Sequence, residues 1–225
     1  RNHSSAASDV YKRQGAGHLL QMFIDVPYEA GVGLTLLIVV LYTCVGGFVS
    51  VVRTDVMQGL LMLVGSVVIF YFVTRAAGGV GSISRLSALQ EKQFLFELNG
   101  GIPFAVLLGV SLSGSLKLLA DPRQLSRFYA LKDEAEVLRG KWIATIGLAI
   151  VLGCLFPVGI YAHLILTDVT DTDLIVPSLV NDASVFPFWA TDFLVVSILA
   201  AAMSSMDSVL LVAASTLYKN IVAPF

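Results

Sequence analysis

Long stretches without charge are the feature that most constrains how this chain can fold. Four runs contain no Asp, Glu, Lys or Arg, and each has close to the ~20 residues that a helix needs to cross about 30 Å of hydrocarbon. They are residues 30–52, 56–74, 98–116 and 142–167, and a fifth run, 193–218, is interrupted only by Asp207. The alternating ten-residue pattern of a transmembrane barrel is absent. We therefore predict an all-α integral membrane chain with about five transmembrane helices.

The distribution of charge predicts how these helices are oriented. Residues 117–141 carry six Lys or Arg, which is typical of a cytoplasmic loop, whereas residues 168–192 carry five Asp and no Lys or Arg. We expect the first loop inside the cell and the second outside. Only 13% of the residues are charged and the net charge is −2. No basic patch for nucleic acid is present, and we expect most of the surface to contact the lipid bilayer.

The first fourteen residues, RNHSSAASDVYKRQ, differ in composition from everything that follows. They lack the apolar core of a signal peptide and resemble translated adaptor or vector sequence, so we expect residues 1–14 to be foreign to the fold. Residues 15–225 are then expected to form part of the membrane domain of a longer protein.

The fifth apolar run carries a strip of polar residues. At 100° per residue, Ser204, Ser205, Asp207 and Ser208 share an arc of about 160°, which predicts that this face points at protein or water. A carboxylate inside a membrane costs roughly 2.5 kcal/mol or more, and it therefore indicates a functional site. A hard monovalent cation would offset that cost, since hydroxyl and backbone carbonyl oxygens are the ligands it prefers.

Explanations without a bound ion stay open for the same residues. Serines at helix interfaces permit close packing and bond back to carbonyls one turn earlier, which is our interpretation of Ser215. Asp207 can be protonated, or it can face an aqueous vestibule at the cytoplasmic side.

A second carboxylate lies between the first two apolar runs, in GGFVSVVRTDVMQ, residues 46–58. The glycine pair permits a tight turn, after which Thr54 is a plausible N-cap with Asp55 in the first helical turn. That structural role is sufficient to explain both residues. Asp55 nevertheless falls on the same, cytoplasmic side as the lower half of the last run, so the two can approach each other.

Three blocks in order resemble the sodium:solute symporter family, the sodium-coupled transporters of sugars, proline, pantothenate and monocarboxylates. They are GG, SV, TD and Q within residues 46–58, ADPRQLSRFYALKD at 120–133, and ILAAAMSSMDSVLLVAASTLYKNI at 198–221. The resemblance implies a leucine-transporter-like core of ten helices in two inverted repeats. Residues 15–24 would end core helix three and the five runs would be core helices four to eight. Core helices one, two, nine and ten would then lie outside this chain.

The resemblance also implies which residues bind ions. One sodium site would use the Ala201 carbonyl and the hydroxyls of Ser204 and Ser205, together with carbonyls of core helix one. A second ion, where members have one, would use Asp55, Ser204 and Ser208. Asp207 stands where those members have serine, which leaves the ion stoichiometry and a proton-linked role open.

Solute binding is expected near residues 109–122, GVSLSGSLKLLADP, whose glycines and serines are typical of a helix unwound around its substrate. Ser115 and Lys117 are the candidates for solute contact. The alternative for Lys117 is that its side chain extends to the inner membrane surface.

The resulting hypothesis is sodium-coupled symport of a small organic solute by a multi-pass protein of the plasma or inner membrane. Sodium would be the coupled ion. We do not expect an enzyme, because the sequence has neither a metal-spaced His/Glu set nor a Ser/His pair. The alternative function is a symporter-like sensory domain of a membrane signalling protein, which the sequence beyond Phe225 would distinguish.

Overall fold

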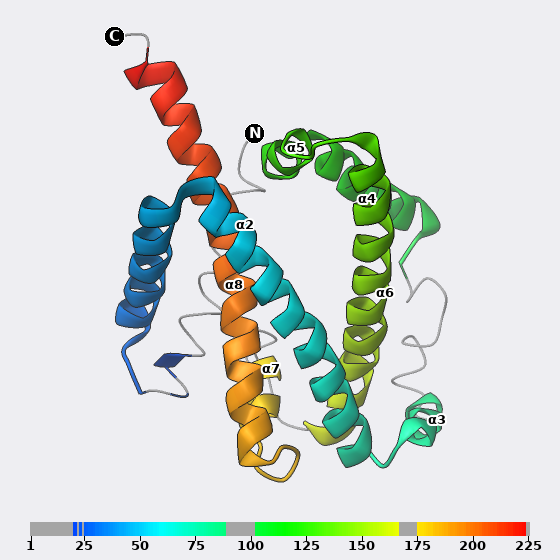
Figure 1. The fold of residues 1–225 in the computed structure, drawn as a ribbon. Coiled ribbons are helices and arrows are strands. Elements are labelled where there is room, and N and C mark those ends of the chain that lie inside the picture. Colours follow the sequence, from blue (N-terminus) through cyan, green and yellow to red (C-terminus); the bar gives the residue numbers. More distant parts are fainter. Residues whose placement is uncertain (1–19, 22, 24, 89–101, 167–174, 224–225) are drawn as a thin grey trace. The chain divides into compact units, whose positions relative to one another are not determined.

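The computed structural model describes residues 20–223, apart from 22, 24, 89–101 and 167–174. Every regular element in these residues is a helix (Figure 1), as the long uncharged runs predicted. The larger helices are α2 (Tyr28–Ala76), α4 (Phe104–Ala120), α6 (Glu134–Ile165) and α8 (Phe188–Leu217). The shorter ones are α3 (Ile83–Ser87), α5 (Pro122–Tyr129), α7 (Ile175–Val180), a 3₁₀ turn at Val80–Ser82 and a π-helical turn at Tyr218–Val222.

Helix α2 is bent at Gly47, where the backbone takes φ 57° and ψ −151°. A side chain would clash with the backbone in this conformation, so glycine is the residue that permits it. The 49 residues of α2 would extend about 74 Å as one straight helix, far more than a bilayer. Gly47 divides them into residues 28–46 and 48–76, which run to the same side of the bend (Figure 1). We call these two segments the first and second limbs of α2.

The prediction that Thr54 caps a helix beginning near Asp55 was wrong. The bend is made at Gly47 alone, and the second limb is already helical at Thr54. The Thr54 hydroxyl donates to the carbonyls of Ser50 and Val51, at 3.1 and 2.9 Å. This is the bonding of a threonine in the middle of a helix.

The chain divides into two compact units, one of residues 1–72 and 168–225 and the other of residues 73–167. The first unit holds the first limb of α2 and the second limb up to Phe72, together with α7 and α8. In it α7 is held to α8 by the Thr191 hydroxyl, which donates to the Val180 carbonyl at 3.2 Å.

The second limb of α2 packs antiparallel against α8. A Cβ added at Gly65 would lie 2.9 Å from both Cβ and Oγ of Ser197, so the two helices approach closely there. Farther along α2, the Phe72 ring lies 5.7 Å from that of Phe186 and 5.8 Å from that of Trp189. Small residues at the crossing and aromatic rings beyond it thus fix the register of this helix pair.

In the second unit, the break between α4 and α5 falls at Asp121, whose extended backbone (φ −73°, ψ 115°) ends one helix and caps the next. Pro122 follows as the first residue of α5, where its missing N–H costs nothing. In α6, the Tyr161 side chain is 1% exposed, and its hydroxyl donates to the Val80 carbonyl at 3.4 Å.

Three of the described helices are long and apolar enough to cross a membrane, namely Tyr28–Ala76, Glu134–Ile165 and Phe188–Val222. A fourth span results if Phe104–Lys117 and Pro122–Tyr129, which meet at 43°, are counted as one bent pair. The all-α, multi-pass membrane class is therefore correct.

Candidate functional site

Polar side chains from three helical segments of the first unit meet in one cluster. Tyr42 comes from the first limb of α2, Asp55 and Gln58 from the second limb, and Ser204 and Asp207 from α8. All five interrupt apolar sequence. Positions three apart on a helix lie on the same face. Asp55 and Gln58 therefore share one face of α2, and Ser204 and Asp207 share one face of α8. We call these five residues the polar cluster.

The Ser204 hydroxyl donates a hydrogen bond of 2.8 Å to Oδ1 of Asp55. This contact links the second limb of α2 to α8, as the common cytoplasmic placement of the two residues suggested. A hydroxyl that donates to a carboxylate keeps both oxygen lone pairs available. Ser204 is therefore able to hold Asp55 and to accept a positive charge at the same time.

Asp207 is fully buried, with 0% exposure, and its Oδ1 accepts a hydrogen bond from the Tyr42 hydroxyl. A buried carboxylate without hydrogen bonds would be costly, so the tyrosine is one reason why α8 tolerates an aspartate at this depth. The sequence analysis missed Tyr42. The residue lies in an uncharged run, and its sequence signal is only that its hydroxyl requires a partner wherever the ring is buried.

Gln58 is part of the first block that resembles the family, but no role was predicted for it from the sequence. Its side chain is 8% exposed and its carboxamide lies at the Tyr42 hydroxyl. Among the described residues, Oε1 of Gln58 has no hydrogen-bond partner. The spacing of three residues from Asp55, inside an otherwise apolar helix, was the signal that could have found it.

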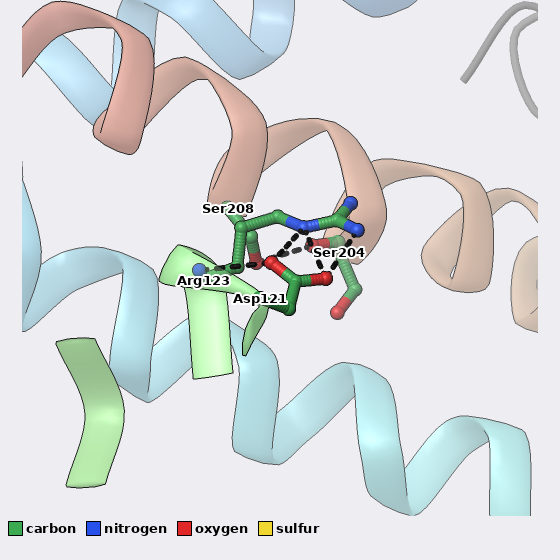
Figure 2. A network of polar contacts seen from close by, with 4 residues as sticks. All are labelled: Asp121, Arg123, Ser204 and Ser208. Atoms are coloured by element: carbon green, nitrogen blue, oxygen red, sulfur yellow. Dashed lines mark hydrogen bonds and ion pairs between the residues drawn. The ribbon is translucent and has the colours of Figure 1, made fainter. Parts of the chain in front are cut away.

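The remaining hydroxyls of the strip bond back to their own helix. Ser205 donates to the Ala201 carbonyl at 3.3 Å, and Ser208 donates to the Ser204 carbonyl at 3.1 Å. Figure 2 shows Ser204 and Ser208 one turn apart on α8. Thus the structure brings Ser204 to Asp55 and places Ala201 beside Ser205, whereas the Ser208 hydroxyl donates to a carbonyl of its own helix. The role of these residues as ion ligands stays a prediction.

Ser215 lies beyond this region and is exposed, and its hydroxyl donates to the Val212 carbonyl at 3.0 Å. This bonding within the helix fits the bland interpretation of Ser215.

The helix break expected within residues 109–122 is present, but it falls at Asp121, near the end of that range, and not at the glycines and serines. Helix α4 is continuous from Phe104 to Ala120. Glycine and serine only weaken a helix, and here the Ser115 hydroxyl donates to the Ser111 carbonyl at 2.9 Å instead of leaving the helix for a ligand. Ser115 and Lys117 are both exposed. Their contact with solute stays a prediction, and the break at Asp121 lies beyond both residues.

The break in this part of the chain is organised by Asp121 and Arg123, shown in Figure 2. The Asp121 carboxylate accepts from the Arg123 backbone N–H at 3.0 Å and from its guanidinium at 2.6 Å. Hydrogen bonds from the Arg123 side chain hold the pKa of Asp121 below its usual value. Asp121 therefore caps α5 as a carboxylate anion, which Arg123 holds in place.

Within the described ranges, no group of three or more His, Cys, Asp or Glu side chains is placed to hold a metal ion. A cation bound at the polar cluster would therefore use carboxylates only in part. The other ligands would be hydroxyl, carboxamide or backbone carbonyl oxygens, which is a ligand set for a hard cation.

A family model described as "Sodium:solute symporter family" matches residues 7–224. The chain belongs to this family. The match begins inside the first fourteen residues, which the sequence analysis set apart from the fold. Members of the family are multi-pass proteins of the plasma membrane, and several described helices of this chain are long and apolar enough to span a membrane.

Curated relatives agree with the family. The chain is 27% identical to a sodium/pantothenate symporter of Haemophilus influenzae and 29% identical to that of Escherichia coli, over 92% of this chain and 43% of each relative. It is 30% identical to an osmoregulated proline transporter of Bacillus subtilis, over 93% of this chain and 42% of the relative. The chain thus spans about two fifths of the length of these relatives. They are transporters rather than enzymes, and their names give the sensory alternative no support. The comparison with solved structures found no match.

Proposed function

We propose that the protein to which this chain belongs carries out sodium-coupled symport of a small organic solute. The single observation that carries the proposal is the hydrogen bond between Ser204 and Asp55, which holds a carboxylate of α2 against the polar strip of α8. A carboxylate between apolar helices is costly when nothing compensates its charge. A sodium ion taken from outside and released inside would compensate it in part of the transport cycle.

The chemistry that these residues supply suits sodium. Asp55 would contribute the negative charge. The hydroxyls of Ser204 and Ser205 and the carbonyl of Ala201 would contribute neutral oxygens, and Ser208 would add a further hydroxyl on the same face. Family members complete such a site with carbonyls of core helix one, which the proposed correspondence of helices would place outside this chain. Asp207 would add a second carboxylate where those members have serine, and the number of coupled ions stays open.

The same proposal includes the correspondence between these helices and the core helices of a leucine-transporter-like bundle. The two limbs of α2 would be core helices four and five of a leucine-transporter-like bundle, α4 with α5 core helix six, α6 core helix seven and α8 core helix eight. The membrane potential then supplies about 2.3 kcal/mol per charge per 100 mV. This energy corresponds to roughly 50-fold accumulation of solute for each coupled ion.

The solute class is proposed from the relatives. Pantothenate and proline, which appear in their names, are both small molecules that bear a carboxylate. A small carboxylate-bearing organic solute is therefore the first class to test for uptake.

The test is the sodium dependence of uptake by the full-length transporter that carries this chain. Asp55→Asn and Ser204→Ala should each raise the sodium concentration for half-maximal uptake about tenfold, since the first removes the negative charge and the second a hydroxyl ligand, each worth about 1.4 kcal/mol. Ser215→Ala is the matched control, because this exposed serine of the same helix bonds only within α8 in the structure. An unchanged sodium dependence in both site variants would disprove the assignment.

A further inference from the structure

Gln58 is placed in the polar cluster with half of its carboxamide unsatisfied. The side chain is 8% exposed, and Oε1 has no hydrogen-bond partner within the described part of the chain. A buried acceptor without a donor costs about 1–3 kcal/mol, so such groups are few in native proteins and each requires a reason. Packing alone gives none, since Leu or Met would fill a similar volume in this apolar helix without that cost.

The surroundings of Gln58 are those of a cation site. Its carboxamide lies at the Tyr42 hydroxyl, which also donates to the carboxylate of Asp207. One turn earlier on the same face of α2, Asp55 accepts the hydrogen bond of Ser204. Two carboxylates and a serine hydroxyl therefore belong to the same cluster as a carbonyl oxygen that no donor among the described residues satisfies. Such an oxygen is suited to a positive charge.

We infer that Oε1 of Gln58 is a further neutral oxygen ligand of the cation bound by Asp55 and Ser204. The inference rests on the proposed sodium site and adds to it a residue to which the sequence analysis gave no role. Carboxamide carbonyls are regular ligands of hard cations, and two carboxylates with one or two hydroxyls fall short of the five or six oxygens such an ion needs. Gln58 supplies one of the missing oxygens from the helix that already carries Asp55.

Gln58→Met removes the carbonyl oxygen and keeps the length of the side chain. In the full-length transporter it should raise the sodium concentration for half-maximal uptake about fivefold, the factor for a contact worth about 1 kcal/mol. The half-saturating solute concentration at saturating sodium should stay unchanged, because the inference gives Gln58 a contact with the cation and none with the solute. Gln58→Glu keeps an oxygen at the same distance from the backbone, so it should restore sodium affinity relative to Gln58→Met.

Ser66→Ala is the matched control on the same limb of α2. Ser66 is 3% exposed, but its hydroxyl donates to the Leu63 carbonyl at 2.8 Å, and it lies about 12 Å along the helix from Gln58. It tests whether any buried polar-to-apolar change on this helix alters sodium affinity. An equal shift in Ser66→Ala and Gln58→Met would overturn the inference.

The outcomes for Gln58 and for the proposed function are distinguishable. If Asp55→Asn raises the half-saturating sodium concentration and Gln58→Met does not, the ligand role of Gln58 is wrong and the sodium site stands. If neither variant changes it, both are wrong. Should Gln58→Met fail to reach the membrane, the selectivity of Gln58→Glu for lithium over sodium decides. A changed ratio supports coordination by this side chain, and the wild-type ratio overturns it.

Discussion

The Tyr42 hydroxyl donates a hydrogen bond to Oδ1 of Asp207, across 165 positions of sequence. This bond joins the first limb of α2 to α8, and the bond between Ser204 and Asp55 joins the second limb to the same helix. Both limbs of one bent helix are thus held to α8 at the level of the polar cluster. Since both contacts involve carboxylates, a change of charge at the cluster will act on both limbs.

Tyr42→Phe should lower the stability of the protein. The substitution keeps the ring and removes a donor to a fully buried carboxylate, which we expect to cost about 1–2 kcal/mol, at the upper end for hydrogen bonds in membrane helices. The measurement is the midpoint of thermal unfolding in detergent. Tyr71→Phe is the control, because Tyr71 lies on the same helix, is 56% exposed and contacts Phe72 through its ring. Equal midpoints for the two variants would show that the Tyr42 hydroxyl contributes nothing to stability.

Gly65→Ala tests the closest approach of α2 and α8. The added methyl group would lie 2.9 Å from both Cβ and Oγ of Ser197, so the helices must separate, at a cost of about 1–3 kcal/mol. The double variant Gly65→Ala/Ser197→Gly removes the clashing atoms and should regain much of that loss. Gly59→Ala has open space around the new methyl group and should be neutral. A destabilised Gly59→Ala, or a double variant worse than the sum of its parts, would contradict this packing.

Gly47→Ala should destabilise the bend of α2. At φ 57° and ψ −151° the new Cβ is strained, which costs about 1–3 kcal/mol, although no neighbouring atom lies within 4 Å of it. Gly33→Ala has similar open space but an ordinary helical backbone, so it should be neutral or stabilising by up to ~1 kcal/mol. Thermal unfolding of the two variants side by side checks the prediction. If Gly47→Ala is as stable as Gly33→Ala, the backbone at residue 47 is not strained.

The ion pair of Asp121 and Arg123 predicts a dependence of stability on pH. The pKa of Asp121 is lowered in the folded state, so its stabilisation is complete above the unfolded value of about 3.9 and is lost as pH falls through the lower, folded value. Asp121→Asn keeps an acceptor for the cap but removes the charge. The stability difference between wild type and Asp121→Asn should be about 1 kcal/mol or less at pH 7, constant down to pH 5, and should vanish in stronger acid.

Glu136→Gln provides the comparison for that experiment. Its partner Arg139 is 74% exposed and the Glu136 side chain 49% exposed, so the loss of this solvated pair should not change stability measurably at pH 7. Unfolding midpoints between pH 3 and pH 7 separate the two cases. A difference for Asp121→Asn that persists unchanged at pH 3 would mean that the carboxylate charge is not its source.

Sequence reasoning predicted the elements that depend on composition and missed those that depend on packing. The uncharged runs predicted helices, and the glycine pair at residues 46–47 predicted a turn that the structure makes at Gly47. The N-cap role predicted for Thr54 was wrong because one glycine suffices for the bend. The helix therefore resumes several residues before Thr54. The break in the next span follows Asp121 and Pro122 rather than the glycines of α4, because isolated glycines do not end a helix held by its own hydrogen bonds.

The candidate site was predictable only where a charge marks it. Asp55 and Asp207 stand out in apolar sequence, and the helical period groups Ser204 with Asp207. Tyr42 and Gln58 carry no such mark, since a tyrosine or a glutamine in an apolar run is ordinary until a neighbouring helix buries its polar end. That burial comes from the bend at Gly47 and from the pairing of α2 with α8, which no local pattern contains.

The second limb of α2 contacts α8 at three heights, through Asp55 with Ser204, Gly65 with Ser197, and Phe72 with Trp189. These contacts are spread over about 26 Å of helix, so the two helices are braced along nearly a whole bilayer thickness. In the proposed transport cycle we expect the two helices to move together as one rigid pair. Gly47, at one end of that pair, is the natural pivot.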